Sequence, residues 1–235
     1  MKEERADNAS PLAALNPLIV FSVLIPIAAT MLITRVFFKE MTSSLTAGFV
    51  MFPFLVYVGF NFLTVIGGAF ALRSRLRWRD IGFRHFRWKD VFLGAGAAIV
   101  GIFIVYPLAM FLAGIIGFAG MKGMSYSLDD TLNIFSAVLI ASLIGPLAED
   151  IIFRGFLLSF LRDKYARPWL TVAGGIVLFT FVHVFYFGWS GVLFIFLWTP
   201  LSVGLFLWRK SIYPCLVLHT LNNIVAYVLV PVLLK

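Results

Sequence analysis

Long apolar runs separated by short basic tracts are the feature that most constrains how this chain folds. A helix rises about 1.5 Å per residue, and the apolar layer of a bilayer is roughly 30 Å thick. Runs long enough to cross it occupy residues 18–36, 45–72, 91–120, 132–160, 169–187, 189–208 and 213–234. We therefore expect an all-α, polytopic integral membrane bundle of about seven (six to eight) transmembrane helices. Residues 1–235 then form a single transmembrane domain.

Composition excludes an ordinary soluble domain. The chain is 61% hydrophobic and 13% charged, whereas soluble domains are roughly half apolar and about a quarter charged. The net charge of +8 does not indicate nucleic-acid binding, because the basic residues lie in short tracts between apolar runs, as membrane topology requires. The single cysteine, Cys215, excludes an internal disulfide and provides no CxxC metal pattern.

A tract at residues 73–90 mixes basic and aromatic side chains. Seven Lys or Arg stand against two Asp, and Trp78, Phe83, Phe86 and Trp88 lie between them. This pattern suits the headgroup layer of a membrane. We predict a cytoplasmic interfacial segment in which Arg73 to Lys89 contact anionic headgroups; a substrate-docking site is the alternative. With the basic tracts at 162–167 and 209–210 on the same side, the N-terminus is cytoplasmic.

Three ionisable residues lie inside the run 132–160, where charge is costly and usually functional. On a helix, Asp150 and Arg154 form an i,i+4 pair that can neutralise itself, whereas Glu149 points about 100° away from Asp150. Glu149 therefore has no partner on its own helix. We expect its partner to come from another helix of the bundle.

Two of the three histidines, His183 and His219, lie in later apolar runs. Phe179 shares a helix face with His183, and Asn223 shares one with His219. A carboxylate and two imidazoles that meet in a bundle core can bind a divalent metal such as zinc, or can activate a water by general base catalysis. The amide of Asn223 can donate to an oxyanion. A packing role also stays open, because Asn and His often bridge membrane helices.

Three ordered motifs carry a family resemblance. They are EDIIFR at residues 149–154, FTFVH at 179–183 and HTLNN at 219–223. These resemble the EExxxR, FxxxH and HxxxN motifs of the CPBP family, the CAAX-protease-like and bacteriocin-processing-like (Abi) intramembrane endopeptidases. The resemblance places a catalytic core at residues 132–234. Residues 80–84 and 88–90 also resemble the segment that commonly precedes the core of this family.

The resemblance implies a protease that cleaves a peptide bond of a membrane-associated protein or peptide, prenylated or not. Carried over to this chain, it assigns Glu149 to activation of the attacking water with help from His183. It assigns His219 and Asn223 to stabilisation of the oxyanion. It also implies a prokaryotic plasma membrane as the location.

Supporting roles fall to Asp150, Arg154 and Phe179, with the arginine orienting the acidic pair. Asp150 departs from the family pattern, which usually has a second glutamate at this position. The side chain is one methylene shorter, so we expect activity to survive with a different hold on Arg154.

Two alternatives stay open. The chain has no HExxH motif, and we expect no obligatory cofactor, with a zinc ion held by Glu149, His183 and His219 as the alternative. The second alternative is a non-catalytic membrane scaffold or immunity protein, or a proton-linked transporter, that uses the same buried polar residues. Polar residues concentrate in the C-terminal half without a matching first half, which counts against transport.

Overall fold

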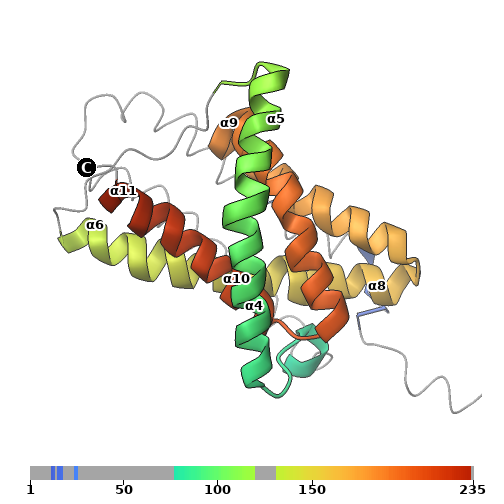
Figure 1. Ribbon diagram of the computed structural model, residues 1–235. Helices are drawn as coiled ribbons and strands as arrows, with labels where there is room; N and C mark the ends of the chain where they lie inside the picture. Colours follow the sequence, from blue (N-terminus) through green and yellow to red (C-terminus); the bar gives the residue numbers. More distant parts are fainter. Residues whose placement is uncertain (1–11, 14, 18–23, 26–76, 120–130, 234–235) are drawn as a thin grey trace, which may run out of the picture.

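Figure 1 shows the computed structural model of the chain, which describes residues 12–13, 15–17, 24–25, 77–119 and 131–233. Helices joined by short loops make up these residues, and no strand occurs among them. The all-α prediction is confirmed for this part of the chain. Apart from residues 24–25, the first two predicted spans lie outside the described residues, as do residues 73–76 of the basic tract.

The third predicted span is one long helix. It consists of α4 (Trp88–Val100), the π-helical η4 (Gly101–Val105) and α5 (Tyr106–Ile116). Gly117, with a φ of 81°, ends it. Within the described part of the chain, three helices are long and apolar enough to cross a membrane: Trp88–Ile116, Phe187–Arg209 and Tyr213–Leu233. The protein is an integral membrane protein, and the full count of seven spans stays a prediction.

The helix that carries the charged stretch runs from Thr131 to Tyr165. Its consecutive segments are α6 (Thr131–Phe135), η5 (Ser136–Ile144), α7 (Gly145–Asp150), η6 (Ile151–Leu158) and α8 (Ser159–Tyr165). Both η5 and η6 are π-helical. Such wider turns change which side chains face a neighbour and are frequent at functional sites. Here they lie directly before and after the turn that carries Glu149.

The helix α9 (Pro168–Arg209) is kinked at Gly188, so it has a first arm before that residue and a second arm after it. Gly188 has a φ of 68° and a ψ of 176°, a backbone conformation that is essentially restricted to glycine. The sequence predicts two spans, 169–187 and 189–208, and the break falls at the residue between them. The kink places His183 and Trp198 on different arms.

We expect Gly188→Ala to reduce the free energy of unfolding by about 1–3 kcal/mol, because alanine is strained at this φ and ψ. An added Cβ meets no atom within 4 Å, so the loss comes from the backbone alone. Gly204→Ala is the matched control, since its Cβ also meets no atom within 4 Å and no positive φ is involved. Unfolding in mixed micelles by sodium dodecyl sulfate measures both variants. Equal effects would contradict the assigned strain.

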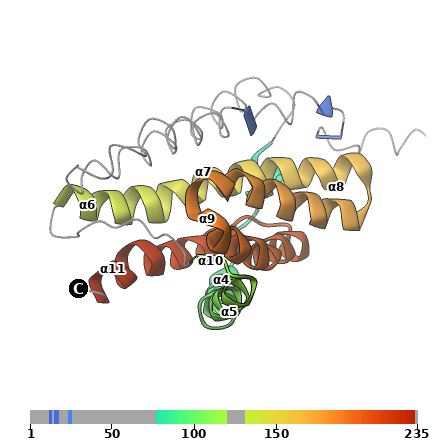
Figure 2. The ribbon, with the colours of Figure 1, turned by 90° about the horizontal axis from the view of Figure 1, so that it is seen from above.

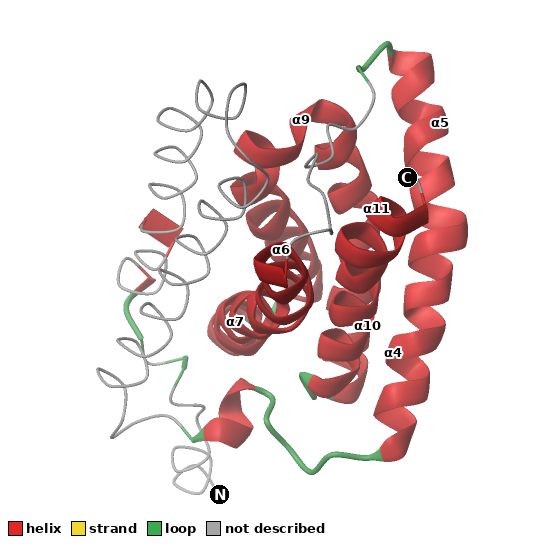
Figure 3. Cartoon of the chain, turned by 90° about the vertical axis from the view of Figure 1, so that its left-hand side faces the viewer, coloured by secondary structure: helices red, strands yellow, loops and turns green. Residues whose placement is uncertain are grey.

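The last predicted span consists of α10 (Tyr213–Ile224), η7 (Val225–Leu229) and α11 (Val230–Leu233). Figure 2 shows this helix beside the one that runs from α6 to α8, and Figure 3 shows α10 between α7 and α4. Gly94 on α4 permits the close approach of α10. A Cβ at this position would lie 2.5 Å from the carbonyl oxygen of Pro214 and 2.6 Å from Cβ of Val217. This packing holds α10 closely against α4, on the side away from α7.

The described part of the basic and aromatic tract packs onto the turn between α9 and α10. After the short 3₁₀ helix η3 (Trp78–Ile81), Gly82 accepts a backbone hydrogen bond from Ile212 at 3.1 Å. Asp90 is fully buried, and both Nε and Nη2 of Arg209 lie 2.8 Å from its Oδ1. Several basic side chains of the tract are exposed: Arg77, Arg79, Arg84, Arg87 and Lys89.

Candidate active site

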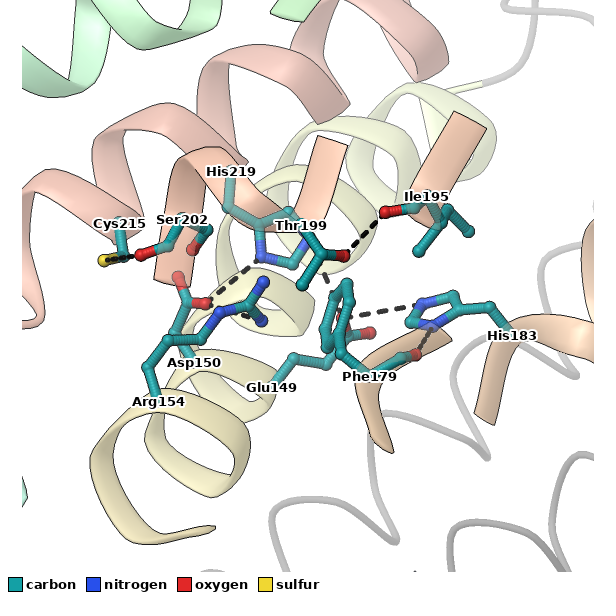
Figure 4. A network of polar contacts seen from close by, with 10 residues as sticks. All are labelled: Glu149, Asp150, Arg154, Phe179, His183, Ile195, Thr199, Ser202, Cys215 and His219. Carbon is teal, nitrogen blue, oxygen red and sulfur yellow. Dashed lines mark hydrogen bonds and ion pairs between the residues drawn. The ribbon is translucent and has the colours of Figure 1, made fainter. Parts of the chain in front are cut away.

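The three predicted motifs meet in the interior of the bundle (Figure 4). Glu149 and Asp150 come from α7 and Arg154 from η6. His183 comes from the first arm of α9, and His219 comes from α10. Each of these five residues is at most 7% exposed. Ionisable side chains buried this close together are tolerated only when they pair with one another.

Glu149 faces both histidines. Its Oε2 lies 3.8 Å from Nε2 of His183 and 3.7 Å from Nε2 of His219. Both separations are too long for a direct hydrogen bond, and each is short enough for one water to contact both groups. A carboxylate and an imidazole that share a water can orient it and accept its proton.

The backbone fixes the orientation of His183. Its Nδ1 lies 2.7 Å from the carbonyl oxygen of Phe179, one helical turn earlier. A carbonyl only accepts hydrogen bonds, so Nδ1 carries the hydrogen and donates it. In the neutral ring, Nε2 is then the acceptor, and this is the nitrogen that faces Glu149. The i,i+4 spacing in FTFVH therefore sets the tautomer of His183.

Arg154 is enclosed by Asp150 and two aromatic rings. Its Nη1 lies 3.0 Å from Oδ1 of Asp150, which confirms the predicted i,i+4 pair. Its Cζ lies 3.8 Å from the centroid of Phe179 and 5.8 Å from that of Trp198. A cation over an aromatic face is favoured, more so when water is excluded. Phe179 thus supports Arg154 with its ring and His183 with its carbonyl.

His219 lies between the two carboxylates. Its Nε2 faces Glu149, and its Nδ1 lies 3.6 Å from Oδ1 of Asp150. The centroid of Trp198 is 5.3 Å from that of the imidazole. The sequence did not single out Trp198 or the contact with Asp150. One Trp in an apolar run gives no signal, and the contact depends on how α10 is rotated against α7.

Asn223 is one helical turn beyond His219 and is partly buried. Its Nδ2 donates a hydrogen bond of 2.9 Å to the carbonyl oxygen of Ala141 on η5. One amide hydrogen thus joins α10 to η5, as Asn often does between membrane helices. A primary amide has a second hydrogen for another acceptor.

The donor types fit a zinc site, since Glu149, His183 and His219 offer one carboxylate and two imidazoles. Their spacing is wide, because donor atoms around tetrahedral zinc are about 3.4 Å apart for bonds of about 2.0–2.1 Å. Here Glu149 is 3.7 and 3.8 Å from the imidazoles. Within the described ranges, no group of three or more His, Cys, Asp or Glu side chains is arranged to hold a metal ion.

Comparison with known proteins identifies one family. Residues 131–225 match the family model described as Rce1-like, type II CAAX prenyl endopeptidase Rce1-like. The match begins at the first residue of α6 and ends one residue beyond α10, so it contains all three motifs. No curated protein and no solved structure matches the chain. The predicted resemblance is confirmed over the segment that carries the buried cluster.

Proposed function

We propose that this protein hydrolyses a peptide bond of a membrane-associated protein or peptide. Its residues 131–225 match the Rce1-like type II CAAX prenyl endopeptidase family. The family match supports a protease in general terms. The observation that carries the specific proposal is the position of Glu149, buried within 3.8 Å of an imidazole nitrogen on each of two other helices.

In the proposed reaction, a water lies between Glu149 and His183 and gives hydrogen bonds to Oε2 and Nε2. Its oxygen attacks the peptide carbonyl as Glu149 takes one proton. His219 and the second amide hydrogen of Asn223 stabilise the oxyanion. The carbon–nitrogen bond then breaks, and the proton held by Glu149 passes to the leaving amine. This reaction makes one carboxylic acid and one amine from each peptide bond and water.

The test is to identify which peptides accumulate uncut in membranes when the protein is replaced by its Glu149→Ala variant. We expect a small set of membrane-associated substrates to accumulate, and His183→Ala to cause the same accumulation. The cellular phenotype is scored separately from cleavage. Intact function in both variants would overturn the proposal and would favour a scaffold that does not depend on these side chains.

We propose further that the water is activated without an obligatory metal, because Glu149 can accept a proton and the fixed Nδ1–H tautomer of His183 leaves Nε2 free to orient the water. We expect purified, chelator-washed protein to retain activity with far less than one zinc per chain by elemental analysis. Stoichiometric zinc, together with loss of activity on stronger chelation, would instead assign the three side chains as ligands.

The exposed basic side chains of the tract support a position at the cytoplasmic surface against anionic headgroups, with the N-terminus on the same side. Exposed aromatic rings accompany them, with Trp78 61% exposed and Trp88 74% exposed. We expect a single cysteine placed at Arg84, in a Cys215→Ala background, to react with an impermeant reagent only from the cytoplasmic side. Reaction from the outer side of intact cells would contradict this topology and would place the tract outside the cell. The proposed location of the protein, with this topology, is a prokaryotic plasma membrane.

A further inference from the structure

We infer that Asp150, held by Arg154, is a positioning residue that orients the imidazole of His219 beside Glu149. The inference rests on the proposed function, because the proposed chemistry gives the His219 orientation its importance. It goes beyond mutual neutralisation of Asp150 and Arg154, the role that the sequence predicts for this pair.

The first observation is the contact itself. Oδ1 of Asp150 lies 3.6 Å from Nδ1 of His219, and Asp150 is fully buried. Neither carboxylate oxygen of Asp150 nor Nδ1 of His219 has a hydrogen-bond partner within the described part of the chain. Such groups are costly to bury without a partner. A shift of a few tenths of an ångström would let Nδ1–H donate to Oδ1 and would satisfy both groups.

This hydrogen bond would define which nitrogen of His219 faces the reaction. An ionised carboxylate only accepts, so the ring must present Nδ1–H to Asp150. To stabilise the oxyanion as proposed, Nε2 must carry the second hydrogen, so His219 acts there as the imidazolium, which donates from both nitrogens. Nε2 is then directed at Glu149, where its present separation from Oε2 is 3.7 Å. A third group that orients an imidazole in this way recurs in enzymes with catalytic or metal-bound histidines.

In a second buried Asp–Arg pair both carboxylate oxygens are occupied, since Oδ2 of Asp90 also accepts the backbone N–H of Arg87 at 3.3 Å. Asp90 receives both Nε and Nη2 of Arg209 at 2.8 Å. Asp150 has one longer approach from Arg154, at 3.0 Å, which leaves its oxygens without a satisfied hydrogen bond. The Asp150 carboxylate, paired with Arg154 through Oδ1, therefore keeps acceptor capacity for His219, whereas the Asp90 carboxylate is occupied.

The two histidines are supported through one residue. The ring of Phe179 lies under Arg154, which contacts Asp150, and the carbonyl of Phe179 holds His183. Figure 4 shows these side chains arranged around Glu149. Phe179 therefore contributes to the support of both histidines. A change at Asp150 acts on the support of His219.

The kinetic test compares Asp150→Asn, Asp150→Glu and the matched control Asp90→Asn, each purified and reconstituted with a membrane-peptide substrate. Asp150→Asn is expected to lower kcat about 10- to 100-fold, by analogy with the loss when a group that orients a metal-bound histidine is removed, with KM changed less than about twofold. Asp150→Glu, which retains the carboxylate, is expected to recover most of kcat. Asp90→Asn breaks the buried pair that joins α4 to the end of α9 and should keep kcat within about twofold of the wild type.

A spectroscopic test does not depend on activity. The chain has three histidines, so ¹⁵N-histidine spectra are simple to assign with single His→Gln variants. In the wild type, we expect His219 to carry hydrogen on Nδ1, and Asp150→Asn to shift the His219 nitrogen signals while those of His85 stay in place. Unchanged His219 signals, equal kcat in the two Asn variants, or no recovery in a folded Asp150→Glu protein would each overturn the inference. If the wild type shows no cleavage, or cleavage that does not depend on Glu149, the proposed function would instead be overturned.

Discussion

Replacement of Glu149 by Gln is expected to lower kcat about 10³-fold or more while KM stays nearly constant. Gln matches the size of Glu and keeps the side chain buried, but it cannot take a proton from water. General base catalysis typically contributes 10²–10⁴-fold. The measurement is steady-state cleavage of a membrane peptide by reconstituted protein, with thermal unfolding as the check on folding.

Asp163→Asn is the matched control for Glu149→Gln, because Asp163 lies on the same helix and pairs with Arg162 outside the cluster. We expect it to retain activity within about twofold. His183→Ala is expected to cost about 10²-fold, and the double variant of Glu149 and His183 should cost little more than Glu149→Gln alone, since the two act on one water. If the loss of kcat in the double variant equals the product of the two single losses, the shared role is contradicted.

Arg154→Leu is expected to reduce the free energy of unfolding by about 3–5 kcal/mol. Asp150 and Arg154 are 0% and 1% exposed, so removal of the guanidinium leaves a carboxylate in the interior without its close ion-pair partner. The substitution also removes the cation over the ring of Phe179. The midpoint of unfolding in mixed micelles measures the loss.

Two variants complete this test. Arg77→Leu breaks the ion pair with Asp80, in which the Arg77 side chain is 62% exposed. It should lower the free energy of unfolding by less than about 1 kcal/mol. Replacement of both Asp150 and Arg154 by Leu should recover most of the stability lost in Arg154→Leu, because no isolated charge is then buried. A loss in Arg154→Leu no larger than that in Arg77→Leu would contradict the burial of the pair.

The helices were predictable because a chain in lipid satisfies its backbone within each helix. The predicted span 91–120 stops at Ile116 because Gly117 adopts a positive φ. The predicted span 132–160 continues to Tyr165, where the basic residues Arg162 and Lys164 suit the negative end of the helix dipole. Helix length followed from apolar composition, whereas the end residues depended on local backbone geometry.

In the candidate site, contacts within one helix were predictable and contacts between helices were not. The pair Asp150–Arg154 and the turn from Phe179 to His183 follow from the periodicity of the helix. The approach of Asp150 to His219 depends on the rotation and depth of α10, which the close packing at Gly94 helps to set. No spacing in the sequence contains that information.

The carbonyl of Phe179 has a consequence for how this site can change. Because the acceptor for His183 is a backbone atom, substitution of the side chain at position 179 leaves it in place. The ring beneath Arg154, in contrast, is removed by any aliphatic replacement. The hydrogen bond that orients His183 therefore survives a point mutation at this position. The ring contacts with Arg154, with His183 at 4.6 Å and with His219 at 6.0 Å between centroids do not survive it, so position 179 links the two halves of the site.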